Sequence, residues 1–257
     1  MYPKTGLCFL LLGACLAAPL AAHAESLPDT VDKVRPSIVG VGTQSPTRQP
    51  PVSFLGTGFA VASGNLIVTN AHVVPPVLDP EGKEKLGILV RQNGQAVFRE
   101  AELVGSDKAH DLALLRIAGV PLPPLTIGDS SRVREGEEVA FTGFPIGMVL
   151  GLYPATHTGR VAGITPIVLP ALTSRQLDTK VVKRLQSGAF SIFQLDATAY
   201  PGNSGSPVYE PETGKVIGII NMVFVKGTKE AALTAPSGIT YAIPSNFIDE
   251  LLRAKAP

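Results

Sequence analysis

Residues 198–207, the serine loop, have the sequence TAYPGNSGSP and lie between two apolar runs. A serine between glycines is common in ordinary turns, so the loop alone indicates little. Two upstream segments change its meaning. The segment TNAHVV at 69–74 contains His72, and the segment DLALLRI at 111–117 begins with Asp111. Histidine, aspartate and serine in this chain order form one of the known orders of a nucleophilic triad.

The chemistry of a serine nucleophile explains why these residue types matter together. A serine hydroxyl reacts poorly at neutral pH unless a base accepts its proton and a third group orients that base. We therefore predict Ser204 as nucleophile, His72 as base and Asp111 as the orienting carboxylate. Gly202 and Gly205 let backbone amides face the reacting group. The amides of Gly202 and Ser204 are predicted to form the oxyanion hole.

Other residues could hold these roles, and each has a weaker context. His110 directly precedes Asp111, so its side chain should point away from that carboxylate. His157 lies among polar and small residues and is expected on the surface. Asp107 sits in a polar turn of the kind found on surfaces. An α/β-hydrolase is disfavoured because Ser206 breaks the Gly-x-Ser-x-Gly pattern and the triad order differs.

Composition limits the class of protein. The chain has 257 residues, 45% hydrophobic and 17% charged, which is typical of a globular chain and argues against disorder. The formal net charge is +1, and no basic stretch indicates a nucleic acid or anionic membrane partner. Neither a Cys/His cluster nor a glycine-rich phosphate loop is present, so we expect no metal and no cofactor.

Residues 1–24 have the pattern of a signal peptide, with Lys4 before an apolar run and a small-x-small site before Glu25. This predicts a secreted or periplasmic protein without stable membrane insertion. The alternative is a lipoprotein, because the four residues ending at Cys15 resemble a lipobox. Cys8 and Cys15 both lie in this segment, so the mature soluble chain would contain no disulfide.

Many short apolar runs separated by Gly and Pro predict an all-β fold. The predicted strands are 37–42, 56–62, 66–69, 85–90, 96–104, 112–117, 138–143, 156–161, 191–196, 208–209, 216–225 and 238–242. One helix is predicted at about 245–254, capped by Ser245, and we expect it to pack on the second half of the chain. Residues 164–188 could form a short helix or a long surface loop.

Several motifs occur together in one order along the chain. They are TGF at 57–59, TNAHVV at 69–74, DLALL at 111–115, GFP at 143–145, GRV at 159–161, DA at 196–197 with GNSG at 202–205, and YAIPS at 241–245. Over about residues 30–253 the chain resembles the protease domain of the HtrA (Deg) family, within the trypsin-like serine proteases. HtrA proteins usually carry a C-terminal PDZ domain, and none is expected in this sequence.

This resemblance implies two six-stranded antiparallel β-barrels, as in chymotrypsin and trypsin, within a protease domain at 25–257. Barrel 1 would span about 30–120, barrel 2 about 125–243, and the helix about 245–254. The triad would lie in the cleft, with Ser204 contributed by barrel 2.

The resemblance also indicates a substrate pocket. Thr198 would lie at the base of the S1 pocket, and Ile220, Asn221 and Met222 would line it. These neutral side chains favour small or medium aliphatic P1 residues. Residue 203 is Asn rather than the Asp that a trypsin zymogen needs for activation, so no prosegment cleavage is expected.

These observations predict a secreted or periplasmic serine endopeptidase that acts on polypeptide substrates, in particular unfolded or damaged proteins. The alternative from another class is a catalytically weak binding or chaperone-like protein of the same fold, with a poorly assembled triad. An esterase using the same triad is a third interpretation.

Overall fold

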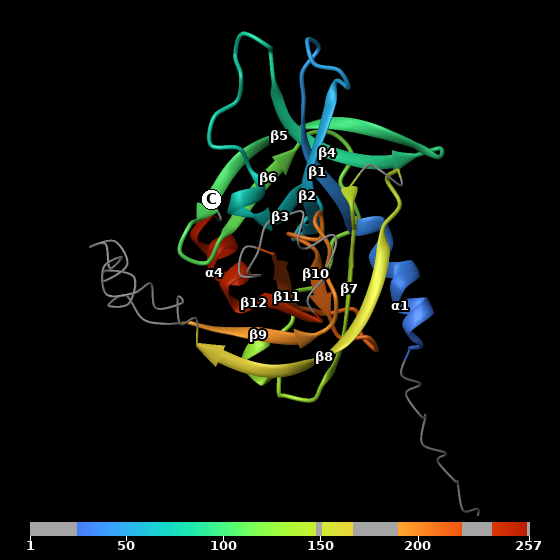
Figure 1. The fold of residues 1–257 in the computed structure, drawn as a ribbon, viewed down its shortest axis with the longest axis vertical. Coiled ribbons are helices and arrows are strands. Elements are labelled where there is room, and N and C mark those ends of the chain that lie inside the picture. The colour runs from blue at the N-terminus through green and yellow to red at the C-terminus, as the bar shows by residue number, and fades with distance from the viewer. Residues whose placement is uncertain (1–24, 148–150, 167–189, 223–237, 256–257) are drawn as a thin grey trace, which may run out of the picture.

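The computed structural model describes residues 25–147, 151–166, 190–222 and 238–255, which form two closed β-barrels (Figure 1). Barrel 1 consists of β1 (Ile38–Gln44), β2 (Val52–Val61), β3 (Leu66–Asn70), β4 (Lys85–Gln92), β5 (Gln95–Asp107) and β6 (Leu112–Ile117). Barrel 2 consists of β7 (Glu138–Gly143), β8 (Ala155–Pro166), β9 (Ser191–Asp196), β10 (Pro207–Tyr209), β11 (Val216–Asn221) and β12 (Ile239–Pro244). The predicted pair of six-stranded antiparallel barrels is confirmed.

The two barrels share one topology. Barrel 1 has the strand order β1-β2-β3-β6-β5-β4, and barrel 2 repeats this connectivity as β7-β8-β9-β12-β11-β10. Every pair of neighbouring strands is antiparallel, and β1 closes on β4 as β7 closes on β10. Closure leaves neither barrel with an exposed edge strand.

An apolar layer joins the barrels to each other. Each barrel has its own buried interior, and a third cluster contains side chains from both. Phe59 and Leu112 of barrel 1 belong to this cluster with Tyr209 and Ile219 of barrel 2, and all four are fully buried. Burial of such large side chains stabilises one relative position of the barrels, so a site shared between them has a defined geometry.

A helix at the N-terminal side, α1 (Leu27–Val34), was not expected from the sequence. Its buried residues are Thr30, Val31 and Val34. A Cβ atom on Gly214 would lie 3.3 Å from the Cγ2 atom of Thr30, so α1 packs against the turn between β10 and β11 of barrel 2. An eight-residue helix contains only two turns, which is too little periodicity to recognise in a sequence rich in strands.

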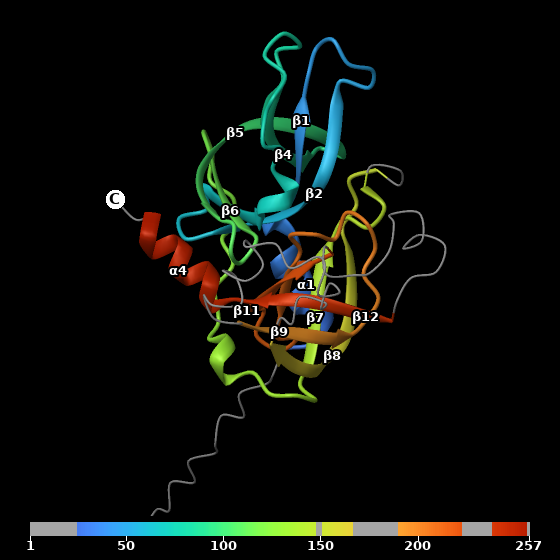
Figure 2. The ribbon, with the colours of Figure 1, turned by 60° about the vertical axis from the view of Figure 1, so that its left-hand side comes forward.

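The predicted C-terminal helix is present as α4 (Asn246–Lys255). Its fully buried Ile248 and nearly buried Leu251 lie on the predicted apolar face. The expected packing was incomplete, because α4 contacts β5 and β6 of barrel 1 as well as β12 of barrel 2 (Figure 2). Apolar periodicity shows which face of a helix is buried but not which strands cover it. Ser245 directly precedes the helix, and its carbonyl accepts from the Ile248 and Asp249 amides, while its hydroxyl donates to the Gly128 carbonyl.

Some predicted features fall outside the described residues. These are the signal peptide at 1–24 with Cys15, residues 167–188 of the irregular stretch, and residues 223–225 of a predicted strand. Residues 164–166 belong to β8, which extends beyond its predicted end. Within the part of the chain that the structure describes, no helix has the length and apolar character needed to cross a membrane.

Candidate active site

His72 and Asp111 lie side by side because two paired strands end there. Asn70, the last residue of β3, is opposite Leu112, the first residue of β6. The chain after β3 forms a 3-10 helix, η2 (Ala71–Val73), with His72 at its centre. Asp111 ends the turn that connects β5 to β6. The strand register therefore brings together two residues that are distant in sequence.

The backbone of Asp111 is held in an uncommon conformation. Its φ is 52°, in the left-handed region that non-glycine residues seldom adopt, although Asp does so more readily than most. Its carbonyl accepts hydrogen bonds from the Ala71 amide at 3.0 Å and from Asn70 Nδ2 at 3.1 Å. Its Oδ1 atom accepts from the His72 amide at 2.9 Å. These contacts fix the carboxylate relative to the imidazole.

The three predicted catalytic side chains form a continuous hydrogen-bonded chain. Nδ1 of His72 is 2.6 Å from Oδ2 of Asp111, and Nε2 of His72 is 3.0 Å from Oγ of Ser204. Asn221 of β11 donates from Nδ2 to the same Oδ2 atom at 2.7 Å. A carboxylate bonded to Nδ1 favours the tautomer in which Nε2 can accept the serine proton.

The serine loop contains a type II turn that its own residues favour. The Asn203 amide donates to the Tyr200 carbonyl at 2.9 Å, with Pro201 and Gly202 between them. Gly202 has a φ of 103°. Proline fixes the φ required at the second position of this turn, and glycine adopts the third without strain. A Cβ atom on Gly202 would lie 2.3 Å from the Phe144 carbonyl oxygen, which excludes a larger residue.

Two residues outside the serine loop hold this turn in place. The Ile146 amide donates to the Pro201 carbonyl at 2.7 Å. The Thr57 hydroxyl donates to the Gly202 carbonyl at 2.7 Å and accepts from the Phe144 amide at 3.1 Å. Since N–H and C=O point in opposite directions across a trans peptide, fixing the Pro201 carbonyl also fixes the direction of the Gly202 N–H.

The amides of Gly202 and Ser204 remain available as donors. Among the described residues, neither amide donates a hydrogen bond to a protein acceptor. The Ser204 carbonyl accepts a hydrogen bond from the Thr57 amide at 2.8 Å, which anchors the serine loop to β2. Two available N–H groups beside a serine hydroxyl can stabilise a negatively charged oxygen that forms there.

The four residues predicted for the substrate pocket lie in different surroundings. Ile220 is fully buried in the interior of barrel 2, and Asn221 is fully buried with its amide directed at Asp111. Thr198 and Met222 are half-buried. Of the four, Thr198 and Met222 therefore retain accessible side-chain surface, whereas Asn221 is a partner of the triad carboxylate.

The alternative residues, Asp107 and His110, are hydrogen-bonded to each other instead of to Ser204. Nδ1 of His110 is 2.5 Å from Oδ2 of Asp107. Burial raises the pKa of Asp107, but the hydrogen bonds from His110 and Ala109 outweigh it, and the net pKa lies below its ordinary value. His110 points away from Asp111, while Asp107 is not the freely exposed turn residue that the sequence suggested.

His157 is half-buried, whereas the sequence predicted a surface position. Its ring stacks on Phe141 of β7 at 4.9 Å between centroids and lies 6.1 Å from the ring of Tyr200. Its Nε2 atom is buried without a hydrogen-bond partner among the described residues. Burial lowers the pKa of His157, so the neutral form is favoured. Its position opposite Phe141 in the β7–β8 register explains the burial.

Residues 56–219 match the family model of the trypsin-like peptidase domain, which is more than half of the chain. The chain belongs to the trypsin-like peptidase family. The matched region of this trypsin-like peptidase contains all three residues of the hydrogen-bonded chain.

Sequence relatives place this trypsin-like peptidase near the HtrA proteins. It is 26% identical over 95% of its length to a probable periplasmic serine endoprotease DegP-like of Marinomonas sp. (strain MWYL1). It is 32% identical over 93% of its length to the human serine protease HTRA3. The chain spans about half the length of these relatives, covering 54% and 48% of them. The resemblance to the HtrA family predicted from the motifs is confirmed.

Solved structures support the same fold. The structure described as HtrA-type protease AlgW with decapeptide superposes with a TM-score of 0.65 at 23% identity. The match covers 90% of this chain and 67% of that chain. At this identity the likeness concerns the fold of the trypsin-like peptidase rather than its substrates.

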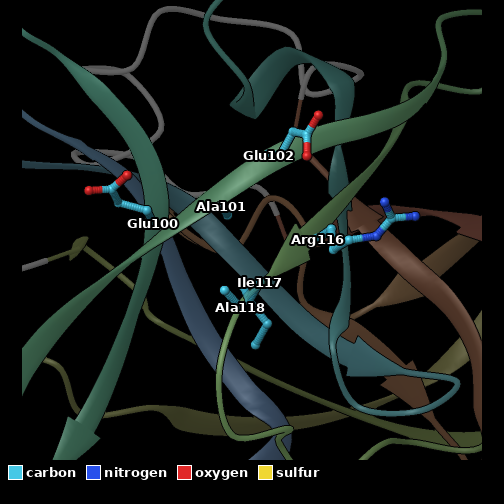
Figure 3. Close-up of a pocket in the computed structure, with 6 residues that line it drawn as sticks. All are labelled: Glu100, Ala101, Glu102, Arg116, Ile117 and Ala118. Atoms are coloured by element: carbon cyan, nitrogen blue, oxygen red, sulfur yellow. The ribbon is translucent and has the colours of Figure 1, made fainter.

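A pocket on barrel 1, away from the triad, lacks the convergent polar groups of a ligand site. It is lined by Glu100, Ala101, Glu102, Arg116, Ile117 and Ala118 of barrel 1 (Figure 3). The two carboxylates and the guanidinium group point in different directions, so polar groups do not converge as they do in ligand sites. Among the described residues, no group of three His, Cys, Asp or Glu side chains could hold a metal ion.

Proposed function

We propose that this trypsin-like peptidase is a serine endopeptidase in which Ser204 is the nucleophile. His72 accepts the proton from the Ser204 hydroxyl as Oγ attacks the scissile carbonyl. Asp111 stabilises the imidazolium that forms and keeps Nε2 directed at the serine. His72 then gives the proton to the leaving amine, and a water molecule hydrolyses the acyl-enzyme by the same steps.

The oxyanion of each tetrahedral intermediate would accept hydrogen bonds from the amides of Gly202 and Ser204. Such donors typically contribute the largest electrostatic stabilisation in acyl transfer, and loss of one lowers the rate by about 10²–10³-fold. The turn held by Ile146 and Thr57 therefore matters for catalysis, because it directs the Gly202 N–H toward the oxyanion.

The observation that carries the proposal is the hydrogen-bonded chain from Asp111 through His72 to Ser204, with distances of 2.6 and 3.0 Å. A catalytically weak binding protein of this fold would be expected to have a broken triad or a collapsed serine loop. The assembled geometry favours the enzyme over that alternative.

The substrates and the location are further parts of the proposal. The DegP-like relatives carry the word periplasmic in their names, and residues 1–24 have the composition of a signal peptide. We place the enzyme in the periplasm or outside the cell, acting on unfolded or damaged polypeptides with small or medium aliphatic P1 residues. Mass measurement of the mature N-terminus distinguishes cleavage before Glu25 from a lipid on Cys15.

The direct test measures casein cleavage and fluorophosphonate labelling by the purified protein, by Ser204→Ala and by Ser206→Ala. The hydroxyl of Ser206 is buried against Gly143 and has no role in the proposed steps, so this variant is a matched control. We expect wild type and Ser206→Ala to cleave and label, and Ser204→Ala to do neither. Cleavage by Ser204→Ala, or no labelling of folded wild type, would refute the assignment.

A further inference from the structure

A second aspartate–histidine pair occupies the turn that leads into Asp111. Oδ1 of Asp107 accepts hydrogen bonds from the amides of Ala109 at 2.9 Å and His110 at 3.2 Å. Oδ2 of Asp107 is 2.5 Å from Nδ1 of His110. The Asp107 carboxylate thus stabilises the turn by accepting hydrogen bonds from two backbone amides, and it also orients the His110 ring.

The His110 ring is docked in an aromatic cluster formed by distant segments. It stacks on Phe247 of α4 with centroids 3.8 Å apart and an interplanar angle of 15°. Phe190, which precedes β9, meets the His110 ring edge-on at 4.6 Å. Phe190 and Phe247 contact each other at 5.2 Å. Aromatic pairs with these geometries stabilise beyond the area they bury.

The cluster connects the two parts of the triad. The turn carrying His110 and Asp111 belongs to barrel 1, whereas α4 and Phe190 are continuous with strands of barrel 2, which carries Ser204. Close packing of α4 continues along β5, because a Cβ atom on Gly105 would lie 3.0 Å from Cγ of Lys255. His110 is therefore a direct side-chain link between the barrel that holds Asp111 and the barrel that holds Ser204.

The conformation of Asp111 makes this link consequential. A non-glycine residue in the left-handed region, such as Asp111, persists only when its surroundings fix it. The hydrogen bonds from Asn70, Ala71 and His72 reach the carbonyl and the carboxylate of Asp111. Among the described residues, the side chain of His110, the residue immediately before it, contacts Asp107 and the aromatic cluster.

We propose that His110 is a positioning residue for the triad, held by Asp107 and Phe247, which keeps Asp111 in register with His72 and Ser204. It does not touch the substrate and acts through the backbone of Asp111. This inference rests on the proposed serine endopeptidase function.

The test uses the full-length protein and fluorescein-labelled casein, and compares kcat, KM and the thermal midpoint. His110→Ala removes both the ring and its N–H, whereas His110→Phe keeps a ring on Phe247 and loses the bond to Asp107. Ile117→Val, at the other end of β6, is the control for a loss of stability alone. Ser204→Ala sets the background.

We expect His110→Ala to lower kcat by about 10- to 100-fold with KM within about twofold of wild type, as small misplacements of catalytic groups do. His110→Phe should show a smaller loss of kcat. Ile117→Val should lower the thermal midpoint and keep kcat. In the NMR spectrum, the chemical shift of the downfield proton between His72 and Asp111 should change in His110→Ala and stay the same in Ile117→Val.

Unchanged kcat in both His110 variants at a lowered thermal midpoint would overturn the inference, since the cluster would then only stabilise the fold. A rise in KM with unchanged kcat would overturn it as well. If wild type turned over casein no faster than Ser204→Ala, the proposed function itself would fail, which is a separate outcome.

Discussion

Ile146 offers the sharpest perturbation of the oxyanion geometry. Its φ is 60°, a conformation that is a true outlier for a β-branched residue. Its amide holds the Pro201 carbonyl at 2.7 Å, while its side chain is 39% exposed. Ile146→Gly keeps the N–H and adopts this φ without strain. Ile146→Pro removes the N–H and forces φ to about −65°.

The expected magnitudes follow from these contacts. In Ile146→Pro the Pro201 carbonyl loses its partner, and the Gly202 N–H is no longer held toward Ser204. Loss of one oxyanion donor lowers kcat by about 10²–10³-fold, or about 2.7–4 kcal/mol. In Ile146→Gly, relief of about 1–2 kcal/mol of left-handed strain is offset by about 0.5–1 kcal/mol of glycine backbone entropy. The stability of this variant should therefore equal that of wild type or exceed it by up to about 1.5 kcal/mol, and its kcat should stay close to wild type.

Steady-state cleavage of labelled casein, with thermal unfolding as a check on folding, measures both variants. We expect a large loss of kcat in Ile146→Pro and near wild-type kcat in Ile146→Gly. Full activity of a folded Ile146→Pro would refute it. Equal losses in the two variants would also refute it, because the side chain rather than the amide would then be responsible.

Three other substitutions test neighbouring contacts. Thr57→Val removes the hydroxyl that bonds Gly202 and Phe144, and should lower kcat and destabilise by about 1–3 kcal/mol in denaturant unfolding; no change in either quantity would contradict this. Ser206→Ala removes a fully buried hydroxyl that has no partner among the described residues, so the unfolding midpoint should rise, and a fall would contradict the prediction. The pKa of His157 is lowered by burial, so as pH falls through about 6.5 the unfolded state takes up a proton that the folded state does not, and stability decreases. His157→Phe should therefore lose less thermal stability than wild type between pH 7.5 and 5.5, and equal slopes would disprove this account.

Most strands of the fold could be predicted from local patterns in the sequence. The strands at 112–117, 138–143 and 191–196 have the predicted bounds, because runs of aliphatic residues there end at polar or glycine residues. The structure also brings His72, Asp111 and Ser204 within hydrogen-bond distance, as their motifs suggested. One signal was available and missed. Asn221 is the single polar residue of the buried strand VIGIIN, which indicates a specific partner.

Contacts between distant segments were beyond the reach of sequence patterns. Phe247 has the spacing of a core residue in α4, and nothing in that spacing shows that it stacks on His110. Ile146 lies in a segment with no regular periodicity, and its amide matters only because Pro201 lies opposite. Such pairings depend on how the barrels close and pack, not on neighbouring residues.

The position of α4 in the chain also affects the order of events during folding. An exported chain emerges from the membrane with its N-terminal side first, and Phe247 emerges after all the strands that the structure describes, because α4 follows β12. Until then the turn before Asp111 lacks its stacking partner, even if barrel 1 has already closed, since domains begin to fold from the N-terminal side as they emerge. A nascent chain with both barrels but no helix would therefore hold its triad loosely. If His110 positions the triad as we propose, docking of α4 is the step that makes the folded chain fully active.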